Sequence, residues 1–272
     1  LGAVQVFAHA RYGQRTVDRL TDPALYAIGP LMVLGLIVSM FHMNDVSHVF
    51  NVFRHFGSSW LTREIVFGIA FAAFGFLFAF LQWFKLAIAP VRHIIAIITG
   101  ILGICLLYSM TSIYATLKAV PAWNIWFTPF QFIAVTVILG CLVIASALVI
   151  TNVFRMHGKK GDHPTVDGVE GGSIDVDSEP APGGGVLVAV KQRVKAINAT
   201  PDEREWALTT SAVRGLTLTA MLALVAWLSA YPIYIADLSF GNEAAHHSAR
   251  VFTEPIFIWF VSFAAAAAIL LA

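Results

Sequence analysis

Charged residues are scarce in this chain of 272 residues. Asp, Glu, Lys and Arg together make up 12% of it, whereas hydrophobic residues make up 58%. Ordinary soluble domains are about 25% charged and about 45–50% apolar. The mean hydropathy is +0.77, so the sequence as a whole is apolar. The composition therefore excludes an ordinary soluble domain and predicts an integral membrane protein.

Cysteine is also rare, and this limits the metal chemistry of the protein. Cys105 and Cys141 each stand alone in an apolar run, and no C-x-x-C pair occurs. The sequence therefore has no iron–sulfur or structural zinc ligand set of its own, and we expect no metal site. None of the nine histidines lies at the centre of an apolar run. This disfavours a haem held between helices, although His42 together with a residue from a missing helix stays open as a ligand pair.

Hydrophobic runs near or above the length that crosses a bilayer, about 20 residues, dominate the rest of the sequence. They are Ala24–Met43, Leu61–Phe84, Ile94–Ala115, Phe127–Phe154, Leu216–Ile235 and Val251–Ala272. Ionisable residues are absent from their centres, which disfavours proton or ion transport. We expect one all-α transmembrane domain over residues 1–272. Its first segment, "LGAVQVFAHA", reads as the end of an earlier helix, so seven or eight helices with incomplete terminal ones are predicted.

The loops between these runs differ in charge. Three that would share one membrane side, Ala10–Pro23, Lys85–Arg92 and Arg155–Trp206, carry twelve Lys and Arg, whereas the opposite loops carry four. The first set is predicted to be cytoplasmic. Residues 156–206 are rich in Gly, Pro, Asp and Ser and read as a cytoplasmic insertion that is partly disordered. A helix-start pattern, Thr200 followed by Pro201, closes this insertion.

The stretch "FHMNDVSHVFNVFRHFGSSWLTRE", residues 41–64, is the most polar connection on the predicted extracytoplasmic side. His42 ends one run, and Ser59 is a candidate N-cap for the next, which places Glu64 in its second turn. An imidazole and a carboxylate at the same depth can accept the protons that leave when a lipid-soluble quinol is oxidised. We therefore predict a quinol-binding site that consists of His42, Glu64, Ser59, Trp60 and Arg63.

A structural role for the same residues stays open. A carboxylate near a helix N-terminus is favourable in itself by roughly 0.3–1 kcal/mol, Arg63 could extend to the interface, and Trp60 could belong to an aromatic belt. The polar residues between the two runs could instead contact a docked protein subunit. The candidates for docking are His48, Asn51, Arg54 and His55.

Two blocks carry a resemblance to a known family. "SMFHMNDVSHVFNVFRHFGSSWLTREIVFG" resembles the segment in which a helix end of the S-M-x-H type precedes a V-F-N-like stretch and a S-x-E-I helix start. "SIYATLKAVPAWNIWFTPFQFIAVTVILG" resembles a tyrosine-ended span, a V-P-x-W connection and a W-x-T-P helix start. Both occur, in this order and spacing, in membrane anchor subunits of the dimethyl sulfoxide reductase family. The resemblance covers roughly residues 37–140.

The resemblance implies an eight-helix anchor in the inner (cytoplasmic) membrane, with both termini and its partners on the extracytoplasmic side. Such anchors hold a molybdopterin catalytic subunit and an iron–sulfur subunit with four clusters. They bind menaquinol without haem and pass its electrons to the nearest cluster in anaerobic respiration. His42 and Glu64 match the quinol-site histidine and glutamate of the family. An arginine usually placed late in the sequence has no secure counterpart here, so Arg214 and Arg250 stay unassigned.

Three alternatives remain at this point. A polysulfide-reductase-type anchor also has eight helices, no haem and an extracytoplasmic quinone site. A purely structural anchor would leave quinone chemistry to another protein, and a small-solute transporter would take up its substrate without partners.

Overall fold

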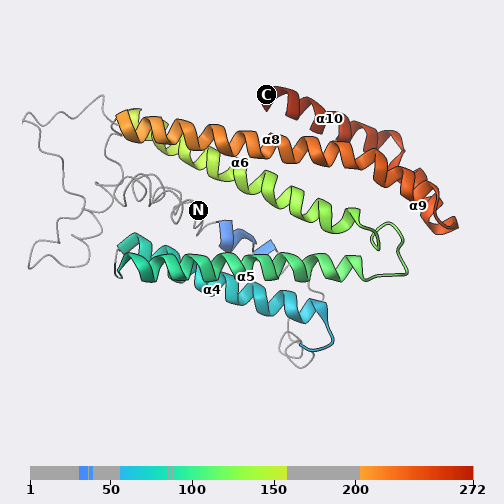
Figure 1. Cartoon of the computed structure of the whole chain (residues 1–272), viewed down its shortest axis with the longest axis horizontal. Coiled ribbons are helices and arrows are strands. Elements are labelled where there is room, and N and C mark those ends of the chain that lie inside the picture. The colour runs from blue at the N-terminus through green and yellow to red at the C-terminus, as the bar shows by residue number, and fades with distance from the viewer. Residues whose placement is uncertain are drawn as a thin grey trace, which may run out of the picture.

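The computed structural model describes residues 31–35, 37–38, 56–84, 86, 88–157 and 203–271. All regular secondary structure in these ranges is helical (Figure 1). After short helical pieces at residues 31–35 and 37–38, the helices are α4 (Trp60–Phe84), α5 (Ala89–Ala115), α6 (Phe127–His157), α8 (Glu203–Ser239), α9 (Glu243–Phe252) and α10 (Pro255–Leu271). The predicted all-α fold class is confirmed.

Four helices of the described part, α4, α5, α6 and α8, are long and apolar enough to cross a membrane. The bent pair of α9 and α10 gives a fifth candidate span if the two helices cross together. The predicted first run, Ala24–Met43, is described only at residues 31–35 and 37–38, which are helical. A total of eight helices stays a prediction.

Glycines let α4 and α5 approach each other closely. The position that a Cβ of Gly103 would take lies 3.1 Å from the ring of Phe71, and that of Gly68 lies 3.7 Å from Leu106. Gly75 faces Thr99 of α5 and also Met32, whose Cε lies 3.0 Å from the corresponding Cβ position. The helical segment at residue 32 therefore packs against the α4–α5 pair.

A buried polar pair closes one end of the same helix pair. The Arg92 Nη1 donates a hydrogen bond of 3.0 Å to Oε1 of Gln82, and these side chains are 6% and 1% exposed. The predicted span began at Ile94, but α5 begins at Ala89, with Pro90 in its first turn. Proline is favoured there because the first N–H groups of a helix need no intrahelical acceptor. Arg92 thus lies inside the helix, where its charge needs a buried partner.

The second pair consists of α6 and α8, which run antiparallel. At one end the ring of Phe127 stacks on Tyr234, with centroids 4.3 Å apart. If the two helices advance residue for residue, position 155 lies level with position 206. The buried polar residues of the far end fit this register, because they form a layer near that level: Asn152, Arg155, Glu205 and Thr209.

The observed start of helix α8 differs from the start of the predicted span and from the end of the predicted insertion. The helix begins at Glu203, not at Leu216, and its 37 residues span about 56 Å at 1.5 Å per residue. The hydrophobic run starts later than the helix, because the first turns of α8 contain charged residues, one of which, Glu205, is buried. Both ends of the predicted 156–206 insertion are also helical, in α6 and α8.

The last predicted run was placed from Val251, and this start is wrong. Val251 and Phe252 end α9, Thr253 caps it, and α10 starts at Pro255. The two helices meet at an angle of 56°. The break follows from the sequence, because a proline cannot continue the preceding helix and is favoured at the start of the next.

One end of the bundle gathers the start of α4, the connection between α5 and α6, the end of α8 and all of α9 (Figure 1). The sequence assigned the loops at these positions to one membrane side, and the structure agrees. The compartment that this end faces stays a prediction.

We expect Gly103→Leu to destabilise the protein by roughly 1–3 kcal/mol, because the larger side chain must displace the Phe71 ring. Gly100→Leu is the matched control, since nothing lies within 4 Å of a Cβ at Gly100. Thermal unfolding of the purified protein in detergent measures both. Equal melting temperatures for the two variants would contradict the close packing of α4 on α5.

Candidate functional site

The start of α4 holds four of the predicted site residues. The Thr62 N–H donates a hydrogen bond of 3.3 Å to the Ser59 Oγ, and the Arg63 N–H donates to the Ser59 carbonyl at 3.3 Å. A side-chain bond to the third helical residue is the usual N-cap geometry. Ser59 is therefore the N-cap of α4, as predicted from the sequence.

Arg63 folds back over the turn that precedes the helix. Its Nε donates to the Phe56 carbonyl at 3.0 Å, and its Nη2 donates to the Gly57 carbonyl at 2.7 Å. Its guanidinium carbon lies 4.2 Å from the ring centroid of Trp60, which is a cation–π distance. Arg63 therefore ties residues 56–60 together instead of extending into solvent.

Trp60 connects this turn to α5. Its ring meets Tyr108 edge to face, with centroids 5.5 Å apart and an interplanar angle of 82°. Such aromatic pairs add about 0.5–1.5 kcal/mol beyond the area that they bury. The Trp60 ring thus has Arg63 on its face and Tyr108 as its edge-to-face partner, which orients the first turn of α4.

Glu64 lies in the second turn of α4 and is half-buried. The contacts of Gly68 with Leu106 and of Phe71 with Gly103 fix the register of α4 against α5, and the same register places residue 64 level with residue 110. Hydroxyl side chains are buried around this level, namely Thr62, Ser109, Thr111 and Ser112. Glu64 is therefore a carboxylate in a partly buried, mildly polar layer between two helices.

Other predicted residues are not placed. His42 and the docking candidates His48, Asn51, Arg54 and His55 lie outside the described residues. The structure brings Ser59, Trp60, Arg63 and Glu64 together on one turn and a half of helix.

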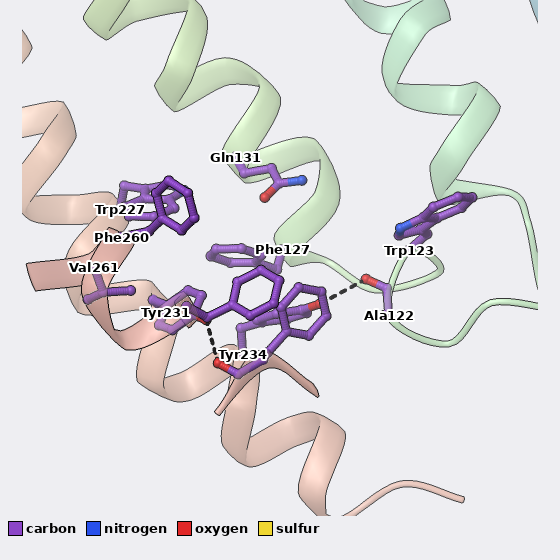
Figure 2. A pocket seen from close by; sticks show the side chains of 11 residues that line it. Ala122, Trp123, Phe127, Gln131, Trp227, Tyr231, Tyr234, Phe260 and Val261 are labelled. Carbon is purple, nitrogen blue, oxygen red and sulfur yellow. Dashed lines mark hydrogen bonds between the residues drawn. The ribbon is translucent and has the colours of Figure 1, made fainter. Parts of the chain in front are cut away.

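A cavity of about 390 Å³ at the same end of the bundle was missed by the sequence reasoning (Figure 2). It lies between α6, α8 and α10, and aromatic side chains form most of its wall. The residues of α8 that line it are Trp227, Tyr231 and Tyr234. Their spacing of three and four places them on one face of a helix, and this was the signal in the sequence that could have found them.

Hydrogen bonds fix the wall of this cavity. The Tyr234 hydroxyl donates to the Ala122 carbonyl at 3.2 Å, and the Tyr231 hydroxyl donates to the Phe252 carbonyl at 3.0 Å (Figure 2). These bonds join α8 to the α5–α6 connection and to the end of α9. The side chains are thus held by contacts from distant parts of the sequence.

Comparison with known proteins adds the family. Residues 12–160 match the profile of the DMSO reductase anchor subunit (DmsC), and this range is more than half of the sequence. The protein belongs to the DMSO reductase anchor subunit family. Together with the apolar helices, this membership makes it a multi-pass membrane protein. The matched range contains the start of α4, whereas the α8 and α10 walls of the cavity lie outside it.

Relatives in two bacteria carry the same description. The sequence is 30% identical over 157 residues to the C subunit of the anaerobic dimethyl sulfoxide reductase of Haemophilus influenzae, covering 56% of this protein and 54% of that one. It is 31% identical over 108 residues to the Escherichia coli protein of that name, covering 40% and 38%. The match thus spans about half or less of the length of these relatives. No solved structure matches this protein.

We expect Arg63→Lys to loosen the turn before α4, because a lysine cannot donate in a fork to two carbonyls or cover the Trp60 ring in the same way. If the turn loses about 1 kcal/mol of local stability, the typical contribution of one hydrogen bond, its amide hydrogens should exchange roughly fivefold faster. Deuterium uptake of the peptide over residues 56–62 measures this. The control is Arg250→Lys on the exposed side of α9. Unchanged uptake in Arg63→Lys would show that these bonds do not hold the turn.

Proposed function

We propose that this protein is a haem-free anchor subunit that oxidises menaquinol and passes the electrons to an iron–sulfur partner of a molybdenum-dependent reductase. The observation that carries this proposal is Glu64, a half-buried carboxylate in the second turn of α4, within the range that matches the anchor family. Buried hydroxyl side chains lie near its level, and a partly buried carboxylate is an acceptor to which a quinol hydroxyl can donate.

Oxidation of a quinol releases two electrons and two protons, so the site needs proton acceptors. A carboxylate can accept a hydrogen bond and then a proton from one hydroxyl. His42, at the end of the preceding predicted span, is the proposed acceptor for the other hydroxyl. Ser59, Trp60 and Arg63 hold the first turn of α4 in place, so they position Glu64 through the helix.

The electrons are proposed to leave toward an iron–sulfur subunit with four clusters, which in turn supplies a molybdopterin catalytic subunit. The names of the relatives, as parts of anaerobic dimethyl sulfoxide reductase, support such partners. His48, Asn51, Arg54 and His55 are the proposed docking residues. They precede α4 in the sequence, so a partner bound there would lie close to the quinol.

The proposed side of the membrane is the extracytoplasmic one. The charge difference between the loops supports it, and the start of α4 lies at the bundle end that carries the less basic loops (Figure 1). Protons released and consumed on that side would make the step non-electrogenic. The membrane is proposed to be the cell inner membrane.

We expect Glu64→Gln to lower the rate of menaquinol-analogue oxidation by roughly a hundredfold, because a general base typically raises a reaction rate by a factor of about 10²–10⁴. The assay uses membranes that contain the assembled complex at matched subunit levels. A reduced viologen dye that donates directly to the partner subunits should support the wild-type rate.

The matched control is Glu243→Gln, which removes an exposed carboxylate from α9 at the same end of the bundle. Normal quinol turnover in Glu64→Gln would favour a purely structural anchor. A complex that reduces polysulfide but no sulfoxide would instead favour the polysulfide-reductase type.

A further inference from the structure

The cavity between α6, α8 and α10 is built like a binding site for a flat ring. The rings of Phe127 from α6 and Tyr234 from α8 stack, with centroids 4.3 Å apart and an interplanar angle of 17°. The ring centroids of Trp227 and Tyr231 lie 6.5 Å and 6.3 Å from that of Phe127. Phe260 of α10 forms a further part of the wall (Figure 2). The volume of the cavity, about 390 Å³, lies in the range of binding sites for small molecules, about 300–1,000 Å³.

The side chain of Trp227 has an unsatisfied hydrogen-bond donor. Its indole Nε1 is buried and has no hydrogen-bond partner among the described residues. An unsatisfied buried donor costs about 1–3 kcal/mol, and native structures rarely keep one without a reason. An acceptor oxygen on a bound molecule would satisfy it.

Gln131 offers a second polar group on the cavity wall. It projects from α6, one turn after Phe127, and lines the cavity with Trp227 (Figure 2). The hydroxyls of Tyr231 and Tyr234 already donate their hydrogens to backbone carbonyls. Trp227 and Gln131 thus offer N–H donors for a ligand, and the indole of Trp123 at the edge of the cavity is a third side-chain donor.

We propose that this cavity binds the ring of an oxidised, lipid-soluble quinone. A quinone has two carbonyl acceptors and no donor, so it pairs with the Trp227 N–H without bringing a hydroxyl hydrogen that needs its own acceptor. Its flat ring fits among the aromatic side chains, and it reaches the cavity from the lipid. The choice of a quinone among acceptor-bearing rings rests on the proposed function.

Glu64 belongs to α4, whereas α6, α8 and α10 line the cavity, and the start of α4 lies at the same end of the bundle as the start of α6 and the end of α8 (Figure 1). The two sites differ in chemistry, because Glu64 is a carboxylate that can accept a proton from a quinol, whereas the cavity offers indole and amide N–H donors to the carbonyls of a quinone. The cavity is therefore a separate site on the same membrane side, suited to the oxidised product, and no electron transfer is assigned to it.

The test uses membranes that contain the assembled complex, with an azido-1,4-naphthoquinone as photolabel and menadione as competitor. We expect label on peptides from the start of α6 and the end of α8, removed by excess menadione. Label that excess menadione leaves in place, or that excess fatty acid removes instead, would overturn the proposal in favour of an acyl-chain groove.

Two variants remove the donors of Trp227 and Gln131, one keeping an aromatic ring and the other keeping the side-chain length. Trp227→Phe and Gln131→Met should each raise the menadione concentration for half-competition by roughly threefold to tenfold, the effect of losing one hydrogen bond. Trp206→Phe is the matched control, because Trp206 is exposed at the other end of α8. Unchanged competition in both cavity variants, with wild-type thermal stability, would overturn the proposal.

Glu64→Gln separates this inference from the proposed function. It should leave the labelling of α6 and α8 intact while quinol turnover falls. If turnover persists and the labelling is still competed by menadione, the cavity inference stands and the quinol site at α4 is wrong. If turnover falls but no peptide of the cavity is labelled, the cavity inference is wrong and the α4 site stands.

Discussion

The hydrocarbon core of a membrane offers no hydrogen-bond partner, and this constraint shapes the whole described part of the protein. Backbone groups are satisfied inside long helices, because an unpaired group would cost several kcal/mol there. Hydroxyl side chains inside the spans obey the same constraint. Ser109, Ser112 and Ser229 donate to the carbonyl four residues earlier, at 2.8–2.9 Å.

The helix ends differ in what they do with their polar groups. At one end of the bundle, the Arg92–Gln82 bond joins α5 to α4, and Arg155 of α6 and Glu205 of α8 are both buried. At the other end, Arg63 and Ser59 act within their own segment and shape the first turn of α4. The first arrangement involves side chains on neighbouring helices, whereas the second fixes the first turn of α4, the segment that carries Glu64.

Both proposed sites depend on close helix packing. Gly68 and Gly103 bring α4 near α5, so Glu64 is partly shielded from water by its neighbour helix. The aromatic cavity depends on the bend between α9 and α10, which returns Phe257 and Phe260 toward α8. The bend arises at Thr253 and Pro255, where the backbone cannot continue one straight helix.

The sequence by itself determined the membrane class, the all-α fold, the Ser59 cap and the family, because hydropathy, capping and motif spacing are local properties. It misplaced the starts of α8 and α10, because Glu205 is charged in the sequence yet buried in the fold, and because a short break can hide inside an apolar run. The role of Arg63 and the cavity around Trp227 were decided by tertiary structure. Arg63 turns toward backbone carbonyls that only the folded turn presents, and the cavity joins residues more than 100 positions apart, which no local pattern encodes.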